Sequence, residues 1–338
     1  MKRFLAAVVL TAALLTAAAP LQAQTDKALG TAAFYNPGMG AYKDIEKREG
    51  QLNMPGRKTA LQYRAVFSRS AKNMPVIVWS HGAFGSHNAY NPLAEYWASH
   101  GYLVLQPTHS DSMREGTKPN VKNPMAFKDW AQRPAEITYM IDQLQNLETL
   151  VPELKGRVDR HLVGIGGHSF GAQTAQLLAG MTAKRGFLAG DAPQSFREKR
   201  ATAFVIISPQ GTNALSDKSS FASIDAPFLM VTGTNDKAAN NDQDYTWRLE
   251  AWNGAPRGPD LYLLLIDGAY HNFGGISGPL RTPMAGPMDN DTMEAVRGAS
   301  LAMFDSQLRG NRAAQAWLQN GAISAFEPSR TKFMLLSK

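Results

Sequence analysis

The sequence predicts an α/β fold, in which helices cover both faces of a mostly parallel sheet. Short runs that are apolar on both strand faces alternate with longer amphipathic segments. Hydrophobic residues make up 44% and charged residues 19% of the 338 residues, as in a globular protein with a substantial core. Alternating strands and helices imply right-handed crossovers, and ligands then bind beyond the carboxyl ends of the strands.

The expected strands are short apolar runs at residues 60–67, 75–79, 102–106, 162–165, 203–207, 228–232 and 261–266. The clearest helix follows Pro134, which suits a first helical turn and precedes apolar residues at the spacing of one helical face. The polar stretch 184–200 and the Gly- and Pro-rich stretch 275–290 are expected to be surface loops beside the ligand site. The interval 207–228 is too short for a large helical cap, so we expect an open site.

The N-terminus has the pattern of a secretory signal peptide. A basic start at residues 2–3 precedes an apolar run at residues 4–19 and then small residues. A membrane-spanning helix needs about 20 apolar residues, so a span is less favoured. We expect cleavage of residues 1–23, a single catalytic domain at residues 24–338 with no integral membrane segment, and a periplasmic or secreted location.

Composition excludes several classes of function. The chain has no cysteine, so disulfides, thiolate metal sites and a cysteine nucleophile are excluded. The net charge is +7, but basic residues are scattered among acids, which favours a solvated surface and gives no motif for nucleic-acid binding. Histidines and carboxylates show no metal-ligand spacing, so we expect neither a metal nor a cofactor. The sequence does not indicate an oligomeric state.

The motif GHSFG at residues 167–171 is the main chemical signal. It follows the apolar run LVGI and precedes the helical pattern AQTAQLLAG, the order that a nucleophile elbow requires. Gly167 and Gly171 would let strand and helix approach closely while Ser169 sits exposed on the turn. The alternative is an ordinary glycine-rich turn between a strand and a helix.

A serine hydroxyl is a weak nucleophile at neutral pH unless a base takes its proton. His271 follows a late apolar strand, and Asp236 ends the run FLMVTGTND between Ser169 and that histidine. The chain order Ser, acid, His is the one this kind of elbow uses, so His271 is the expected base and Asp236 the acid that orients it. Other acids in this interval are expected at a helix start or in a turn: Asp242, Asp244 and Asp267.

Acyl transfer also needs two backbone N–H donors for the oxyanion. One is expected from Phe170, directly after the nucleophile, and the other from Ala83 in the loop after the strand at residues 75–79. His81 and Gly82 precede Ala83 and are expected to support this loop.

Five segments together resemble the α/β-hydrolase superfamily and, within it, the platelet-activating factor acetylhydrolase and predicted dienelactone hydrolase-like group. They are SHGAFGSHNAY, ASHGYLVLQPTHSDS, RPAEITYMIDQL, GHSFGA and HNF, and the similarity extends over residues 75–273. The resemblance implies an α/β-hydrolase fold without a large cap and a serine esterase without cofactor. It assigns the reaction to Ser169, Asp236, His271 and the amides of Ala83 and Phe170.

The predicted function is therefore a secreted carboxylic-ester hydrolase that acts through an acyl-enzyme. A small-molecule or lipid-like ester is the expected substrate, with short acyl groups favoured. Three alternatives stay open: an amidase or peptidase, an acyltransferase with the same residues, and a non-catalytic binding protein on a hydrolase scaffold. A metal-dependent hydrolase is disfavoured because the ligand spacing is missing.

Overall fold

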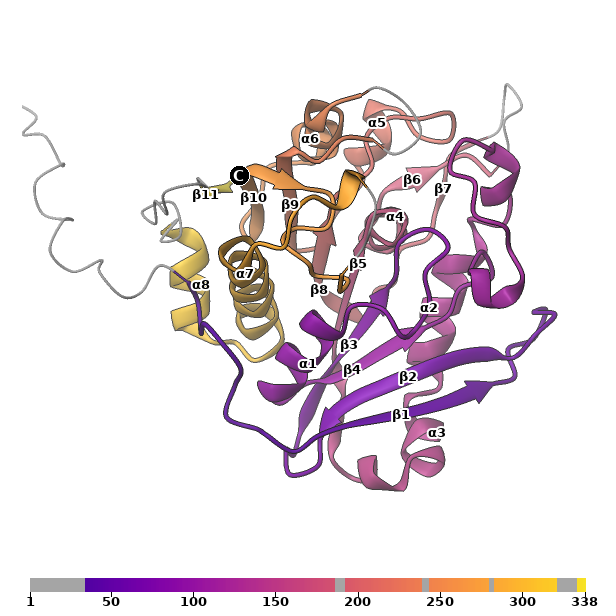
Figure 1. Ribbon diagram of the computed structural model, residues 1–338, viewed down its shortest axis with the longest axis vertical. Coiled ribbons are helices and arrows are strands. Elements are labelled where there is room, and N and C mark those ends of the chain that lie inside the picture. The colour runs from indigo at the N-terminus through magenta and orange to yellow at the C-terminus, as the bar shows by residue number, and fades with distance from the viewer. Residues whose placement is uncertain (1–33, 186–191, 239–242, 280–282, 321–332) are drawn as a thin grey trace, which may run out of the picture. The chain divides into compact units, whose positions relative to one another are not determined.

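The computed structural model contains a nine-stranded sheet with the order β1-β2-β4-β3-β5-β8-β9-β10-β11 (Figure 1). The predicted α/β class is confirmed by this mostly parallel sheet with its helices. The structure describes residues 34–185, 192–238, 243–279, 283–320 and 333–338. The predicted signal peptide at residues 1–23 lies outside these described residues.

Seven strands of the sheet coincide with the seven predicted apolar runs, and the two strands at its edges are additional. The strands of the sheet are β1 Ile45–Leu52, β2 Leu61–Ser68, β3 Met74–Ser80, β4 Leu103–Pro107, β5 Val158–His168, β8 Ala201–Ile207, β9 Phe228–Asn235, β10 Leu261–Tyr270 and β11 Phe333–Ser337. The pairs β1–β2, β2–β4 and β10–β11 are antiparallel, and the remaining pairs are parallel. Two short strands, β6 Thr182–Ala183 and β7 Gln194–Ser195, form a separate ribbon.

The edge strand β1 was missed because it carries no apolar run. Its sequence IEKREGQL is charged, and only Leu52 in it is buried. An antiparallel edge strand needs to bury at most one face, so charged side chains are tolerated there.

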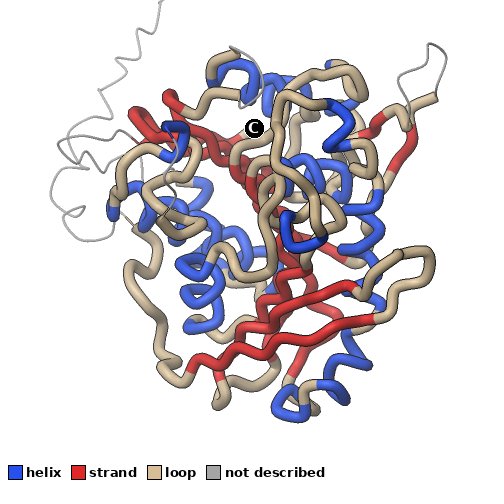
Figure 2. The backbone as a smooth tube through the Cα atoms, turned by 45° about the vertical axis from the view of Figure 1, so that its right-hand side comes forward, coloured by secondary structure: helices blue, strands red, loops and turns tan. Residues whose placement is uncertain are grey.

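Helices cover both faces of the sheet and form two hydrophobic cores (Figure 2). One face packs against α1 Asn91–Ser99, α7 Asn290–Leu308 and α8 Arg312–Gln319. The other packs against α2 Gln132–Asp142, α3 Leu144–Leu150, α4 Phe170–Leu178, α5 Lys218–Phe221 and α6 Tyr245–Gly254. Short 3₁₀ helices lie at Met113–Glu115, Pro124–Phe127, Pro152–Leu154 and Pro283–Ala285. None of the described helices combines the length and apolarity needed to cross a bilayer.

The parallel strands bring five chain segments to one edge of the sheet. Residues 81–85 follow β3, Ser169 follows β5, Ser208 follows β8, and His271 follows β10. Asp236 follows β9. Because the carboxyl ends of parallel strands meet at the same edge, these residues converge although they lie far apart in the sequence.

Candidate active site

Ser169 lies on a sharp turn between β5 and α4. Its backbone has φ 59° and ψ −119°, a conformation that side-chain-bearing residues rarely adopt. A Cβ on Gly171 would lie 2.0 Å from the carbonyl oxygen of Ser80, and one on Gly167 would lie 2.1 Å from that of Gly171. Glycine is therefore required at both positions, and the turn has the form of a nucleophile elbow.

The structure brings Ser169, His271 and Asp236 together in the predicted order. The hydroxyl of Ser169 lies 3.0 Å from Nε2 of His271, whose Nδ1 lies 2.7 Å from Oδ1 of Asp236. A carboxylate at Nδ1 favours the tautomer with its proton there, which leaves Nε2 free to accept the serine proton. The side chain of Asp236 is fully buried.

Asp236 is held by three further groups that the sequence analysis did not identify. The hydroxyl of Thr232 donates to Oδ2, the hydroxyl of Ser208 donates to Oδ1, and Nε of Arg248 lies 3.0 Å from Oδ2. Burial alone would raise the pKa of Asp236, but the charges of Arg248 and His271 lower it. The carboxylate therefore stays ionised although it is buried.

The competing acids have local structural roles. Asp244 caps the N-terminus of α6 through the amide of Thr246, and Asp267 accepts a hydrogen bond from the hydroxyl of Thr234. Asp242 lies outside the described residues.

The two amides expected to stabilise an oxyanion belong to residues that line one cavity with Ser169. This cavity has a volume of about 530 Å³, and its lining includes Ala83 and Phe170. Within the described part of the chain, neither backbone N–H has a hydrogen-bond partner. Both donors are thus available to a substrate oxygen.

The loops that line this cavity are not those expected from the sequence. No described residue of the stretches 184–200 or 275–290 lines it, whereas segments around 121–130 and 210–215 do. The described residues 184–185 and 192–200 belong to the connection from α4 to the beginning of β8, and of these the amide of Lys184 binds the carbonyl oxygen of Leu215, which itself lines the cavity. The segments after β4 and β8 leave the sheet at the same edge as Ser169.

The family comparison agrees with this geometry. Residues 44–189 match the model of the chlorophyllase family, which is part of the α/β-hydrolase superfamily. The chain belongs to the α/β-hydrolase superfamily. The superfamily predicted from the sequence is thereby confirmed, and the match suggests a hydrolase of the esterase kind. No curated protein matches the chain.

The matched part of this α/β-hydrolase contains the elbow and the loop of Ala83 but ends before Asp236 and His271. The assignment of these two residues therefore rests on the geometry of the site.

A chain of hydrogen bonds links the loop of Ala83, the elbow and the histidine loop of the hydrolase. The amide of Gly82 donates to the hydroxyl of Tyr90, which lies 2.8 Å from Nδ1 of His168, and Nε2 of His168 lies 2.7 Å from the carbonyl oxygen of His271. Burial and the neighbouring His271 lower the pKa of His168 well below its usual range. His168 is therefore neutral and donates from Nε2, so it couples the three segments.

A second serine, histidine and carboxylate lie in line beneath the loop of Ala83. The hydroxyl of Ser80 lies 2.8 Å from Nε2 of His109, and Nδ1 of His109 lies 2.6 Å from Oε2 of Glu136. The other carboxylate oxygen accepts a bond of 2.7 Å from Arg57. Both Ser80 and His109 are 0% exposed, so this second arrangement is inaccessible to a substrate.

Glu136 makes the stability of the protein depend on pH. Burial raises its pKa from 4.5 to about 7 against the opposing charges of Arg57 and Arg133. Between these two values the folded protein binds a proton that the unfolded chain has lost, so the free energy of unfolding falls as the pH rises. We expect a loss on the order of 3 kcal/mol across this interval, measured by urea unfolding, and a much smaller one in Glu136→Gln.

The comparison of wild type with Glu136→Gln isolates this effect. Burial lowers the pKa of His81, His109 and His168, and neutral buried imidazoles increase stability as the pH rises, which is the opposite sign. These histidines are present in both proteins, so their contributions largely cancel in the difference. Parallel stability profiles for the two proteins would show that Glu136 is already ionised at low pH.

Proposed function

We propose that the protein is a serine carboxylic-ester hydrolase that acts through an acyl-enzyme. The observation that carries the proposal is the hydrogen-bonded series Ser169, His271 and Asp236, which opens on a cavity lined by two residues whose backbone N–H groups have no partner among the described residues. The match to an esterase family supports the choice of an ester as substrate.

In the proposed mechanism, Oγ of Ser169 attacks the ester carbonyl while Nε2 of His271 takes its proton. The amides of Ala83 and Phe170 donate to the oxyanion of the tetrahedral intermediate. Collapse of this intermediate breaks the bond to the alcohol, which leaves with the proton from His271. Water then loses a proton to His271 and attacks the acyl-serine, and a second collapse releases the acid.

Short acyl esters are the proposed substrates. The cavity next to Ser169 holds about 530 Å³, and its lining mixes amide side chains such as Gln173 and Gln210 with aromatic ones such as Trp130. A long acyl chain is better served by a continuous apolar groove. The N-terminal sequence pattern supports a second proposal, that the enzyme is exported to the periplasm or beyond.

The test is hydrolysis of p-nitrophenyl esters of increasing acyl length by the purified protein, together with labelling by a fluorophosphonate. We expect the highest kcat/KM for short acyl groups and a single label on Ser169, located by mass spectrometry. Cleavage of the matching p-nitroanilides at a comparable rate would favour an amidase. Transfer of the acyl group to an added alcohol in preference to water would favour an acyltransferase. Absence of both hydrolysis and label would overturn the proposal in favour of a binding protein.

A further inference from the structure

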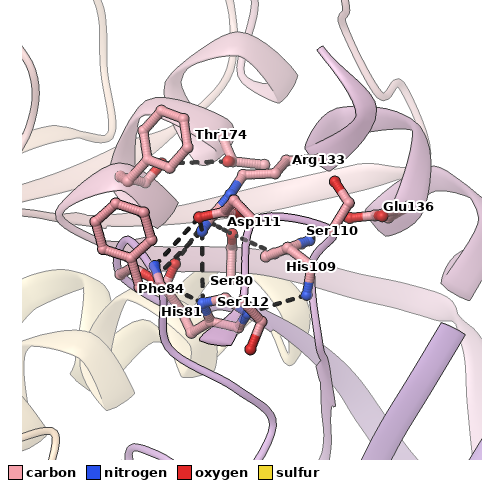
Figure 3. Close-up of polar contacts among 12 residues, drawn as sticks. Ser80, His81, Phe84, His109, Ser110, Asp111, Ser112, Arg133, Glu136 and Thr174 are labelled. Atoms are coloured by element: carbon pink, nitrogen blue, oxygen red, sulfur yellow. Dashed lines mark hydrogen bonds and ion pairs between the residues drawn. The ribbon is translucent and has the colours of Figure 1, made fainter. Parts of the chain in front are cut away.

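Arg133 and Asp111 form a buried ion pair that contacts His81 and Phe84, the residues on either side of Gly82 and Ala83 (Figure 3). Arg133, in the first turn of α2, binds Asp111 with two parallel contacts, Nε to Oδ1 and Nη2 to Oδ2, each 2.8 Å long. The two side chains are 1% and 8% exposed. Burial would raise the pKa of Asp111, but the charge and hydrogen bonds of Arg133 lower it well below its usual range. The pair is therefore permanently charged at neutral pH.

This ion pair binds the backbone on both sides of Ala83. Nη1 of Arg133 donates to the carbonyl oxygen of His81 over 2.7 Å, and Nη2 donates to that of Gly82 over 3.3 Å. On the other side, the amide of Phe84 donates to Oδ2 of Asp111 over 3.2 Å. Phe84 has φ 62°, a left-handed conformation that a phenylalanine adopts only when its surroundings impose it.

The carbonyl of Gly82 shares a peptide plane with the N–H of Ala83. In a planar trans peptide these two groups point in opposite directions. The carbonyl oxygen of Gly82 accepts from Arg133 and also from Nδ1 of His81, which must carry the proton because Nε2 of His81 accepts from the amide of His109. Fixing this oxygen towards the ion pair therefore directs the N–H of Ala83 the opposite way.

The same guanidinium contacts the residue of the second donor. Its central carbon lies 4.3 Å from the ring centroid of Phe170, a cation–π distance. One buried group thus touches the backbone next to Ala83 and the side chain of Phe170, and so relates the positions of the two amides.

We propose that Arg133 and Asp111 are positioning residues that aim the Ala83 amide at the oxyanion of the reaction proposed above. A planar guanidinium is required, because it must bind both carboxylate oxygens and two carbonyl oxygens at once; a lysine ammonium is a point charge on a flexible stem. The simpler alternative is that the pair only anchors α2 on the sheet. In that case its removal would lower stability and leave recognition of the oxyanion unchanged.

The test compares Arg133→Lys, Arg133→Met and Asp111→Asn with Arg157→Met. Arg157 is the matched control because it also binds backbone carbonyls, those of Ser68, Ala71 and Glu153, but at the opposite end of β5. For the first three variants we expect kcat on a short p-nitrophenyl ester to fall about 10- to 100-fold with KM within about threefold, less than the loss of a whole oxyanion donor. Arg157→Met should lower the melting temperature and keep kcat.

Two further readouts separate positioning from stability. The first is the preference for an ester over its thiono analogue, whose sulfur is a poorer hydrogen-bond acceptor; this preference should shrink in the variants and persist in Arg157→Met. The second is amide hydrogen exchange of the peptide 82–86, which should become about tenfold faster in Arg133→Lys. Folded variants with unchanged exchange and an unchanged thiono preference would overturn the positioning role.

These readouts also distinguish failure of this proposal from failure of the proposed function. An inactive, unlabelled wild-type protein would overturn the esterase and with it any role of Arg133 and Asp111 in the reaction. Exchange of the peptide 82–86 would still report whether the ion pair holds the loop. An active wild type with fully active variants would overturn the positioning role alone.

Discussion

Ser169→Ala is expected to lower kcat for ester hydrolysis by about 10⁴-fold or more and to abolish labelling by a fluorophosphonate. Alanine removes the only atom that can form the acyl-enzyme, whereas the amides of Ala83 and Phe170 still stabilise attack by water, so a weak residual activity is expected. The rate is measured with a short p-nitrophenyl ester at saturating concentration. The melting temperature is expected to stay close to that of the wild type, because alanine keeps the Cβ of serine and therefore the same backbone strain at this turn.

Ser80→Ala provides the matched control. Ser80 also lies 2.8 Å from a histidine nitrogen with a carboxylate behind it, but it is fully buried. Access to the cavity distinguishes the two serines, so Ser80→Ala should keep kcat within about tenfold of the wild type and keep the label on Ser169. The proposal would be contradicted if Ser80→Ala alone lost the label while Ser169→Ala kept full activity. That result would make Ser80, and not Ser169, the nucleophile.

The parts of the fold that the sequence predicted are those that burial determines. Strand β3, the second half of β5 and nearly all of β8 are buried on both faces, so they appear in the sequence as short apolar runs. The two edge strands were missed for different reasons: β1 is charged and buries only Leu52, whereas β11 carries the apolar run FMLL but buries only Phe333 and Leu335. The place of β11 follows from its antiparallel pairing with β10, which is distant in the sequence, and a local pattern does not contain that pairing.

The same distinction applies to the site. Ser169, Asp236 and His271 could be predicted because each follows an apolar strand, and parallel strands bring such residues to one edge. The roles of Arg133 and Arg248 could not be predicted, because the sequence does not show which arginine is buried until the acidic partner that neutralises it is known. Arg133 lies 22 positions from Asp111 in the sequence and on a different element, and this pairing exists only in the folded chain.

Asp236→Asn is expected to lower kcat by about 10³- to 10⁴-fold while leaving the label site intact. An asparagine amide can present an N–H to Nδ1 of His271, which favours the tautomer with the proton on Nε2. That nitrogen then faces Ser169 as a donor and does not accept its proton. The loss should appear in kcat more than in KM, because the substrate-lining groups are unchanged.

The same substitution leaves Arg248 buried without its ionic partner. Breaking a buried pair on one side destabilises by about 3–5 kcal/mol, so the free energy of unfolding must be measured together with the kinetics. Asp305→Asn is the control: Asp305 is 5% exposed and accepts from Tyr35, Tyr102 and Arg309 on the face of the sheet that carries α7.

Both asparagine variants should unfold at lower urea concentration, but only Asp236→Asn should lose catalysis at a temperature where each is folded. Equal kcat values for the two folded variants would contradict the role of Asp236 and leave its carboxylate as a partner of Arg248 alone. Loss of kcat confined to Asp236→Asn would instead show that the buried charge of Asp236 acts on His271. Both variants lack a buried carboxylate, but only Asp236→Asn changes the tautomer of His271.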